Sequence, residues 1–195
     1  MKRQHLRFLN QITLAITMVS SANLWAASAK QYISSIISGG NGCPQGSAST
    51  SVTGNLLTVF SDEMFAEGGP GILLSEGRKR CQIAISFVPG QKITVGVKIV
   101  EMEGDVTLTQ GAKATIDSQI YLSGSPITGK STKTFVGPVD KTFNLAASQI
   151  TWLECKKAPR VNIAATAAVR ALPQGEGTVT MNWKSVYQII VKPCT

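Results

Sequence analysis

The densest charge in this sequence is a run of three basic residues, Arg78, Lys79 and Arg80. Such a run can contact a polyanion, for example an acidic polysaccharide, lipid head groups or nucleic acid. A basic run at a strand edge also discourages pairing with another chain, and the pattern favours this structural role. No aromatic residue is interleaved with the cations, so nucleic acid is not expected as a partner.

Acidic residues gather in two regions of the chain. Two carboxylates can serve an inverting or retaining glycoside hydrolase, and the first region supplies several: Asp62, Glu63, Glu67 and Glu76. The second region surrounds Gly104 with oxygen atoms that could bind Ca²⁺, namely those of Glu101, Glu103 and Asp105. Its spacing is not that of an EF-hand loop, and an acidic hairpin end is the favoured interpretation. We therefore assign no catalytic residue, no metal site and no cofactor.

Aromatic residues are the usual stacking surface for sugar rings. Tyr121 is out of phase with the apolar face of its expected strand, which makes it the best candidate for exposed glycan stacking. Trp152 is a second candidate, although its position near Cys155 also suits packing against a disulfide. Trp183 is in phase with neighbouring apolar residues and is expected in the core.

The first 29 residues have the features of a secretory signal peptide. Basic residues precede a mostly apolar run, Phe8–Leu24, and small residues allow cleavage after Ala29 or after Ala26. Polar residues interrupt the run, so a membrane anchor is the less favoured alternative. Cleavage would remove His5, the only histidine, and leave 16 basic and 11 acidic residues, a net charge of +5. A mature chain without histidine excludes Ser-His-Asp and Cys-His catalysis and histidine-ligated metal sites. No membrane span is expected after cleavage.

All four cysteines lie in the mature chain, which predicts two disulfides and a secreted or periplasmic location. Four cysteines allow three pairings, and the sequence alone does not choose among them. We predict Cys43–Cys81 and Cys155–Cys194, because each pair would tie a loop-like segment to the mouth or end of a strand.

Residues 30–195 are expected to form one all-β domain, an antiparallel, jelly-roll-like β-sandwich. Apolar residues alternate through Cys81–Phe87, and again through Lys92–Met102, which suggests a hairpin between the two. Residues 114–122 and 160–172 alternate in the same way. The Gly- and Ser-rich segment 30–54 is expected to be a loop-rich region held through Cys43. A turn is expected at Glu103–Asp105, and residues 144–151 are the one candidate for a short helix.

Four segments resemble the family of secreted proteins catalogued as domain of unknown function 4360, which occurs in bacteria and fungi. They are GNGCPQGSAS at 41–50, NLLTVFSDEMFAE at 55–67, RKRCQ at 78–82 and TWLEC at 151–155. Arg80 departs from the family pattern, which usually has Asn there. The resemblance implies an exported, disulfide-containing β domain and brings no catalytic residues.

These observations favour a binding or structural module that recognises an extracellular polymer such as a glycan, or another component of the cell envelope. One alternative is a carboxylate-dependent glycoside hydrolase. Another is a secreted effector or inhibitor that binds a protein, which would carry an apolar surface patch. The oligomeric state is left open by the sequence.

Overall fold

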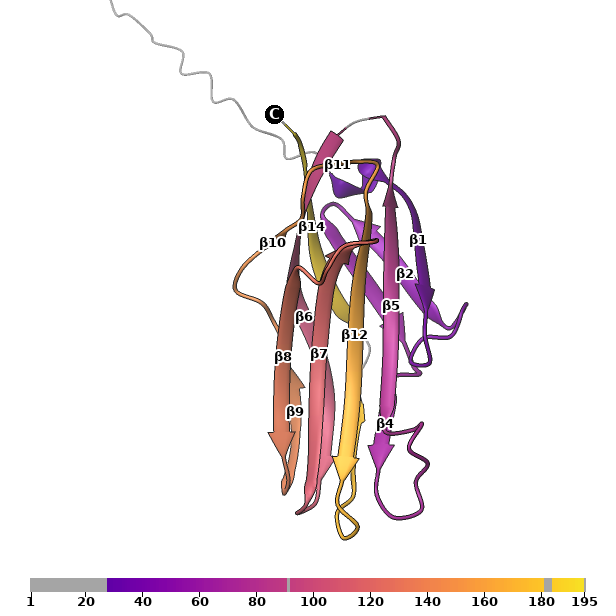
Figure 1. Ribbon diagram of the computed structural model, residues 1–195, viewed down its shortest axis with the longest axis vertical. Coiled ribbons are helices and arrows are strands. Elements are labelled where there is room, and N and C mark those ends of the chain that lie inside the picture. Colours follow the sequence, from indigo (N-terminus) through magenta and orange to yellow (C-terminus); the bar gives the residue numbers. More distant parts are fainter. Residues whose placement is uncertain (1–27, 91, 181–183, 195) are drawn as a thin grey trace, which may run out of the picture.

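The computed structural model describes residues 28–90, 92–180 and 184–194, and it shows two antiparallel β-sheets packed face to face (Figure 1). The predicted signal peptide, apart from its last two residues, and Trp183 lie outside the described residues. Within the described part of the chain, no helix has the length and apolar character needed to cross a membrane.

The five-stranded sheet, here called the small sheet, has a simple order. From edge to edge it contains β1 (Ile33–Gly39), β5 (Arg78–Phe87), β12 (Arg160–Ala171), β7 (Ala112–Leu122) and β8 (Gly129–Val136). The nine-stranded sheet, here called the large sheet, has the path β2 (Ala48–Thr53), β3 (Leu56–Ser61), β14 (Ser185–Pro193), β6 (Lys92–Leu108), β13 (Gly177–Thr180) and β4 (Phe65–Gly68). Three short strands complete it by pairing with β6: β9 (Val139–Asn144), β10 (Thr151–Trp152) and β11 (Lys156–Lys157).

The core lies between the sheets and follows the period-two alternation of the sequence. On β5 the residues expected to face inward are all at most 3% exposed: Cys81, Ile83, Ile85 and Phe87. On β12 the inward face carries the small residues Ala165 and Ala167, and this strand packs against β4 and β13 of the large sheet. Small side chains allow the two sheets to approach closely at this strand. The two packed antiparallel sheets confirm the predicted all-β sandwich.

The connection between β5 and β6 is not the expected hairpin. β5 pairs with β1 and β12 in the small sheet, whereas β6 pairs with β14 and other strands of the large sheet. The chain therefore crosses from one sheet to the other after Phe87. Both strands carry one strongly apolar face, and placing these faces against each other buries both, which side-by-side pairing would not do.

Three local expectations differ from the structure. Segment 30–54 contains β1, β2 and a short 3-10 helix, η1 (Ala29–Tyr32), because its Ser-rich strands have too few apolar residues to reveal their period. β6 continues through the expected turn at Glu103–Asp105, and pairing with β9 holds it extended. The expected helix at 144–151 is absent, because Asn144 ends β9, Thr151 begins β10, and residues 145–150 connect the two strands.

Two disulfides close the fold, and the predicted pairing is confirmed. Cys43–Cys81 ties the β1–β2 loop to β5, and Cys155–Cys194 ties the β10–β11 loop to the residue after β14. Cys43 and Cys81 are 0% and 3% exposed, whereas Cys155 and Cys194 lie at the surface or partly buried. The first bridge is therefore part of the core, and the second fastens peripheral segments.

The buried Tyr187 predicts a loss of stability at alkaline pH. Burial raises the pKa of its hydroxyl to about 12, while nearby Ser118 and Ser185 hydroxyls lower it. The contribution of the neutral Tyr187 side chain to the free energy of unfolding is full below about pH 10, the ordinary tyrosine pKa. It is lost as the pH rises from 10 toward 12, because only the unfolded chain then ionises, and the difference amounts to about 3 kcal/mol. We expect urea unfolding at about pH 8 and pH 11 to show a smaller decline for Tyr187→Phe than for the wild type. Tyr121→Phe, at a half-buried surface tyrosine, is the control and should decline like the wild type.

Candidate functional site

The outer face of the small sheet carries a hollow over part of its central strand, β12. In the middle of β12 the residues that face outward have short side chains. They are Asn162, Ala164, Thr166 and Ala168. Ala164 is 0% exposed and Thr166 is 4% exposed, although they point away from the core. Figure 1 looks onto this face, with β12 between β5 and β7. The cross-strand neighbours Arg78 and Arg80 on β5 and Asp117 and Gln119 on β7 have longer side chains, and we call the outward-facing strip of β12 between them the β12 groove.

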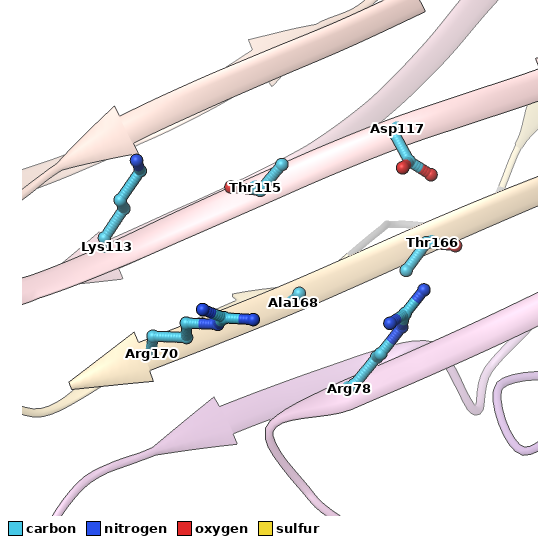
Figure 2. A pocket seen from close by; sticks show the side chains of 7 residues that line it. All are labelled: Arg78, Lys113, Thr115, Asp117, Thr166, Ala168 and Arg170. Atoms are coloured by element: carbon cyan, nitrogen blue, oxygen red, sulfur yellow. The ribbon is translucent and has the colours of Figure 1, made fainter. Parts of the chain in front are cut away.

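Strand register places residues from three distant parts of the sequence in the groove. Thr166 pairs with Arg80 of β5 on one side and with Asp117 of β7 on the other. Two residues further along β12, Ala168 pairs with Arg78 and Thr115. All of these residues except Arg80 line a hollow of about 270 Å³, whose full lining Figure 2 shows: Arg78, Lys113, Thr115, Asp117, Thr166, Ala168 and Arg170.

A second hollow lies on the same sheet near its β1 edge. Its volume is about 330 Å³, and its lining comes from β1 and β5: Ile37, Ser38, Gly39, Gln82 and Ala84. Ile37 is 57% exposed, so the hollow has an apolar rim. The two hollows give the small sheet a corrugated outer surface, which suits an elongated ligand better than a compact one.

Polar side chains at one end of the groove satisfy one another. Gln82 Nε2 donates to Asn162 Oδ1 at 3.1 Å, and Asn162 Nδ2 donates to Ser123 Oγ at 2.9 Å. Asp117 Oδ2 accepts from Gln119 Nε2 at 3.5 Å and lies 4.0 Å from Lys130 Nζ. These two separate sets of contacts orient the side chains beside β12.

Two oxygen atoms of the groove are different. Thr166 Oγ1 and Asp117 Oδ1 are both buried, and neither has a hydrogen-bond partner among the described residues. Their residues are direct cross-strand partners, so the two atoms belong to one small area of the floor. Buried polar atoms in native proteins are nearly always hydrogen-bonded, and an unsatisfied one costs about 1–3 kcal/mol. Both residues line the hollow, so a ligand hydroxyl that displaced a neighbouring side chain could hydrogen-bond either atom.

The tribasic run is divided by the alternation of β5. Arg78 and Arg80 point to the outer face, where Arg78 borders the hollow. Lys79 points the other way, is 17% exposed, and forms a 2.7 Å ion pair with Glu76. This hydrogen bond and the charge of Lys79 lower the pKa of Glu76. Two of the three candidate polyanion contacts thus share one face, and the third stabilises a turn.

Asn41 holds the arginine-bearing end of β5 in place. β1 ends at Gly39, and beyond it the side-chain amide of Asn41 continues the ladder. Its Oδ1 accepts from the Arg80 N–H at 2.7 Å, and its Nδ2 donates to the Arg78 carbonyl at 2.8 Å. The Gly42 N–H adds a bond to the Arg80 carbonyl at 2.9 Å. The backbone that carries both arginines is therefore paired on both sides.

The two candidate stacking aromatics lie on different sheets. Tyr121 is half-buried on the outer face of the small sheet, next to Asn162. Trp152 belongs to the large sheet, is 40% exposed, and lies across Gly96, where a Cβ would collide with its ring. Lys192 Nζ stands 4.5 Å from the centre of the Trp152 ring. The two residues cannot stack on one ligand segment, and only Tyr121 borders the β12 groove.

The acidic residues near Gly104 are engaged within the protein. Glu101 lies 3.7 Å from Lys184 Nζ, Glu103 accepts from Asn144 at 3.1 Å, and Asp105 accepts from Thr142 at 2.8 Å. The described residues contain no group of three or more His, Cys, Asp or Glu side chains able to hold a metal ion. Among the acids of the first region, Glu67 joins Glu176 in lining a separate hollow of about 210 Å³.

One end of the sandwich carries exposed leucines. Leu73 and Leu74, in the loop before β5, are 71% and 98% exposed, and Leu172, just after β12, is 66% exposed. Figure 1 shows these loops together at the end of the molecule opposite η1. This is the kind of surface that the protein-binding alternative requires.

Six of the seven residues that line the hollow were not singled out from the sequence: Lys113, Thr115, Asp117, Thr166, Ala168 and Arg170. The sequence nevertheless contains an indication of this site. Every second residue from Arg160 to Arg170, the set that faces outward, is in order Arg, Asn, Ala, Thr, Ala and Arg. An apolar strand whose other face is short and polar between two arginines indicates a shallow polar channel rather than an ordinary solvated face.

The fold and the groove define a disulfide-stabilised β-sandwich with a polar channel on one sheet face. The chain belongs to the family described as domain of unknown function (DUF4360), whose model matches residues 29–194. An uncharacterized secreted protein of Arthroderma benhamiae is 26% identical over 178 residues, covering 85% of this chain and 73% of the relative. The secreted relative and the two disulfides agree with export of this protein.

Two solved structures resemble the chain at low similarity. One is TmCBM61 in complex with β-1,4-galactotriose, at 9% identity and a TM-score of 0.27, covering 88% of this chain and 97% of the other. The second is the family 11 carbohydrate-binding module of a Clostridium thermocellum cellulase, at 13% identity and a TM-score of 0.26, covering 77% and 85%.

Proposed function

We propose that the protein is an exported binding module that holds a glycan segment in the β12 groove. The observation that carries the proposal is the pair of buried oxygen atoms, Thr166 Oγ1 and Asp117 Oδ1, which have no partner among the described residues although both residues line a hollow of about 270 Å³. Sugar hydroxyls both donate and accept hydrogen bonds, so adjacent hydroxyls of one sugar ring can satisfy both atoms.

The rest of the groove supports the same ligand class. Gln82 and Asn162 hydrogen-bond each other and Gln119 bonds Asp117, so these amide groups of the same outer face are oriented before a ligand arrives. Tyr121 supplies a partly exposed ring for an apolar sugar face. The floor is formed by paired strands rather than mobile loops, which lowers the ordering cost of binding.

A blocking substitution tests the proposal. Ala164→Trp places a large ring on the groove floor without entering the core, because Ala164 faces outward. We expect this variant to lose more than about 100-fold in affinity for any polysaccharide that the wild type binds in calorimetric titration, which corresponds to about 2.8 kcal/mol.

Ser51→Trp is the control, because Ser51 is exposed on β2 of the large sheet. It should bind like the wild type. Thr166→Val is a milder second variant, which keeps the shape and removes one unpartnered hydroxyl; we expect an affinity loss of about 3- to 10-fold. Binding that Ala164→Trp leaves unchanged, or the absence of binding across a panel of neutral and acidic polysaccharides, would contradict the proposal.

A second candidate function is glycoside hydrolysis, which the shared hollow of Glu67 and Glu176 favours. General acid–base cleavage needs two carboxylates on opposite sides of the scissile bond. Release of reducing ends in the same binding samples distinguishes the two functions. Cleavage that Glu67→Gln abolishes would support an enzyme, and unchanged polymer length supports a binding module.

A further inference from the structure

We infer that the hollow between β5, β12 and β7 binds the carboxylate of an acidic sugar, so that the polymer recognised contains uronic acid units. This inference rests on the proposed function and names the ligand class of the same groove. It follows from the charges that border the hollow, from their position relative to the unpartnered oxygens, and from the space above Ala168.

The hollow has an excess of positive charge. Arg78, Arg170 and Lys113 line it, and Asp117 is the single acidic residue in the lining. None of the three cations forms an ion pair within residues 28–90, 92–180 and 184–194. The carboxylate of Asp117 is instead approached by Lys130 and Gln119, on its far side from Arg170. The hollow therefore offers cationic groups that nothing in the described chain neutralises.

The cations surround a small floor residue. Ala168 pairs with Arg78 on β5, and Arg170 follows it on the same face of β12, opposite Lys113. In Figure 2 the guanidinium group of Arg170 lies beside Ala168, and that of Arg78 extends toward Thr166. The methyl side chain of Ala168 leaves the space between the guanidinium groups open. A planar carboxylate fits this space, because guanidinium binds it through two parallel hydrogen bonds and stays charged at every physiological pH.

The two ends of the hollow suit two parts of one ligand. Asp117 and Thr166 form one end, and the Arg170–Lys113 pair forms the other, four residues or about 13 Å further along the strands. A simple anion would gain nothing from a carboxylate such as Asp117 at the site. A sugar acid joined to further sugars uses both ends, since its hydroxyls reach Asp117 and Thr166 while its carboxylate meets the arginines.

Paired polymers that differ only in charge test this inference. The probes are polygalacturonate oligomers and the same oligomers methyl-esterified, with dextran sulfate as a third, non-specific polyanion. Arg170→Gln and Arg78→Gln are the test variants. Arg160→Gln is the matched control, because Arg160 is exposed on the same face of the same strand but ten residues from Arg170, about 33 Å away.

We expect the wild type to bind the acidic oligomers at least about 10-fold more tightly than the esterified ones. Arg170→Gln and Arg78→Gln should each remove most of this difference, whereas Arg160→Gln should leave the affinity for both kinds of oligomer within about 2-fold of the wild type. Such a 10-fold change corresponds to one well-formed charged contact.

Three outcomes would overturn the inference. If acidic and esterified oligomers bind equally and Ala164→Trp abolishes both interactions, the proposed glycan-binding function is retained but the carboxylate site is excluded. Equal effects of Arg160→Gln and Arg170→Gln, with tight binding of dextran sulfate, would show a general field of positive charge that high salt screens. Binding of none of the polymers would remove both the inference and the proposed function.

Discussion

Replacing Cys43 and Cys81 together with alanine is expected to lower the free energy of unfolding by about 4–6 kcal/mol. The bridge spans 38 residues, and loop-closure entropy for such a length accounts for about 4 kcal/mol. The remainder comes from packing, because both side chains are almost fully buried and the deleted sulfur atoms leave voids in the core.

The second disulfide supplies a matched control for this prediction. Cys155–Cys194 spans 39 residues, so its loop entropy is the same, but it lies at the periphery. Cys155→Ala with Cys194→Ala should therefore cost about 1–2 kcal/mol less in urea unfolding. Equal losses in the two double variants would mean that burial of the first bridge adds nothing. A greater loss at the second bridge would contradict the assignment of its role as a peripheral fastening.

Gly40→Ala is expected to destabilise the protein by about 3–5 kcal/mol. Gly40 has a φ of +135°, a conformation that residues with a side chain rarely adopt, and a Cβ there would overlap the carbonyl oxygen of Arg80. Backbone strain of this kind costs about 1–3 kcal/mol. The overlap adds to it, because the Arg80 carbonyl belongs to the paired backbone of β5 and cannot move without losing its bond to the Gly42 N–H.

Gly46→Ala separates the two contributions to this loss. Gly46 lies in the same β1–β2 connection with a φ of +88°, and no atom lies within 4 Å of the position of its Cβ. It should lose only the backbone term, about 1–2 kcal/mol. Amide exchange gives a local readout, since Gly40→Ala should expose the Arg80 N–H that Asn41 now binds. Equal destabilisation by the two substitutions would exclude the contact with Arg80 as the cause.

The sequence was sufficient for the fold class and the inward face of β5, because each depends on a local pattern, whereas the disulfide pairing was one choice among three that the structure confirms. Alternation over Cys81–Phe87 survives in any sheet arrangement. The strands that pair with β5 could not be predicted from its own sequence. A strand with one apolar face fits a hairpin with the next strand and a crossing to the other sheet equally well. The strands β1 and β2 were missed because Ser and Gly occupy positions where apolar residues would have marked the period.

The β12 groove could not be read from the chain for a topological reason. Residues 78–80, 113–117 and 166–170 come together only because β5 and β7 both pair with β12. The tribasic run was visible in the sequence. The strand structure of β5 places its side chains on two different faces, and the turn before β5 places Glu76 where it forms an ion pair with Lys79. Thr166 and Asp117 have unremarkable neighbours in sequence and become distinctive only through their burial.

Both described ends of the chain lie at the same end of the sandwich. Tyr32 of η1 accepts a bond from the Val88 N–H, and the Cys194 N–H donates to Lys92, so both ends flank the β5–β6 crossing (Figure 1). Arg78 begins β5 at the opposite end, about 30 Å away along the strand. If a molecule is coupled to a surface through either described end of the chain, the end of the sandwich that carries Arg78 therefore points away from that surface. Immobilisation by a terminal tag thus leaves the cationic hollow facing the solution.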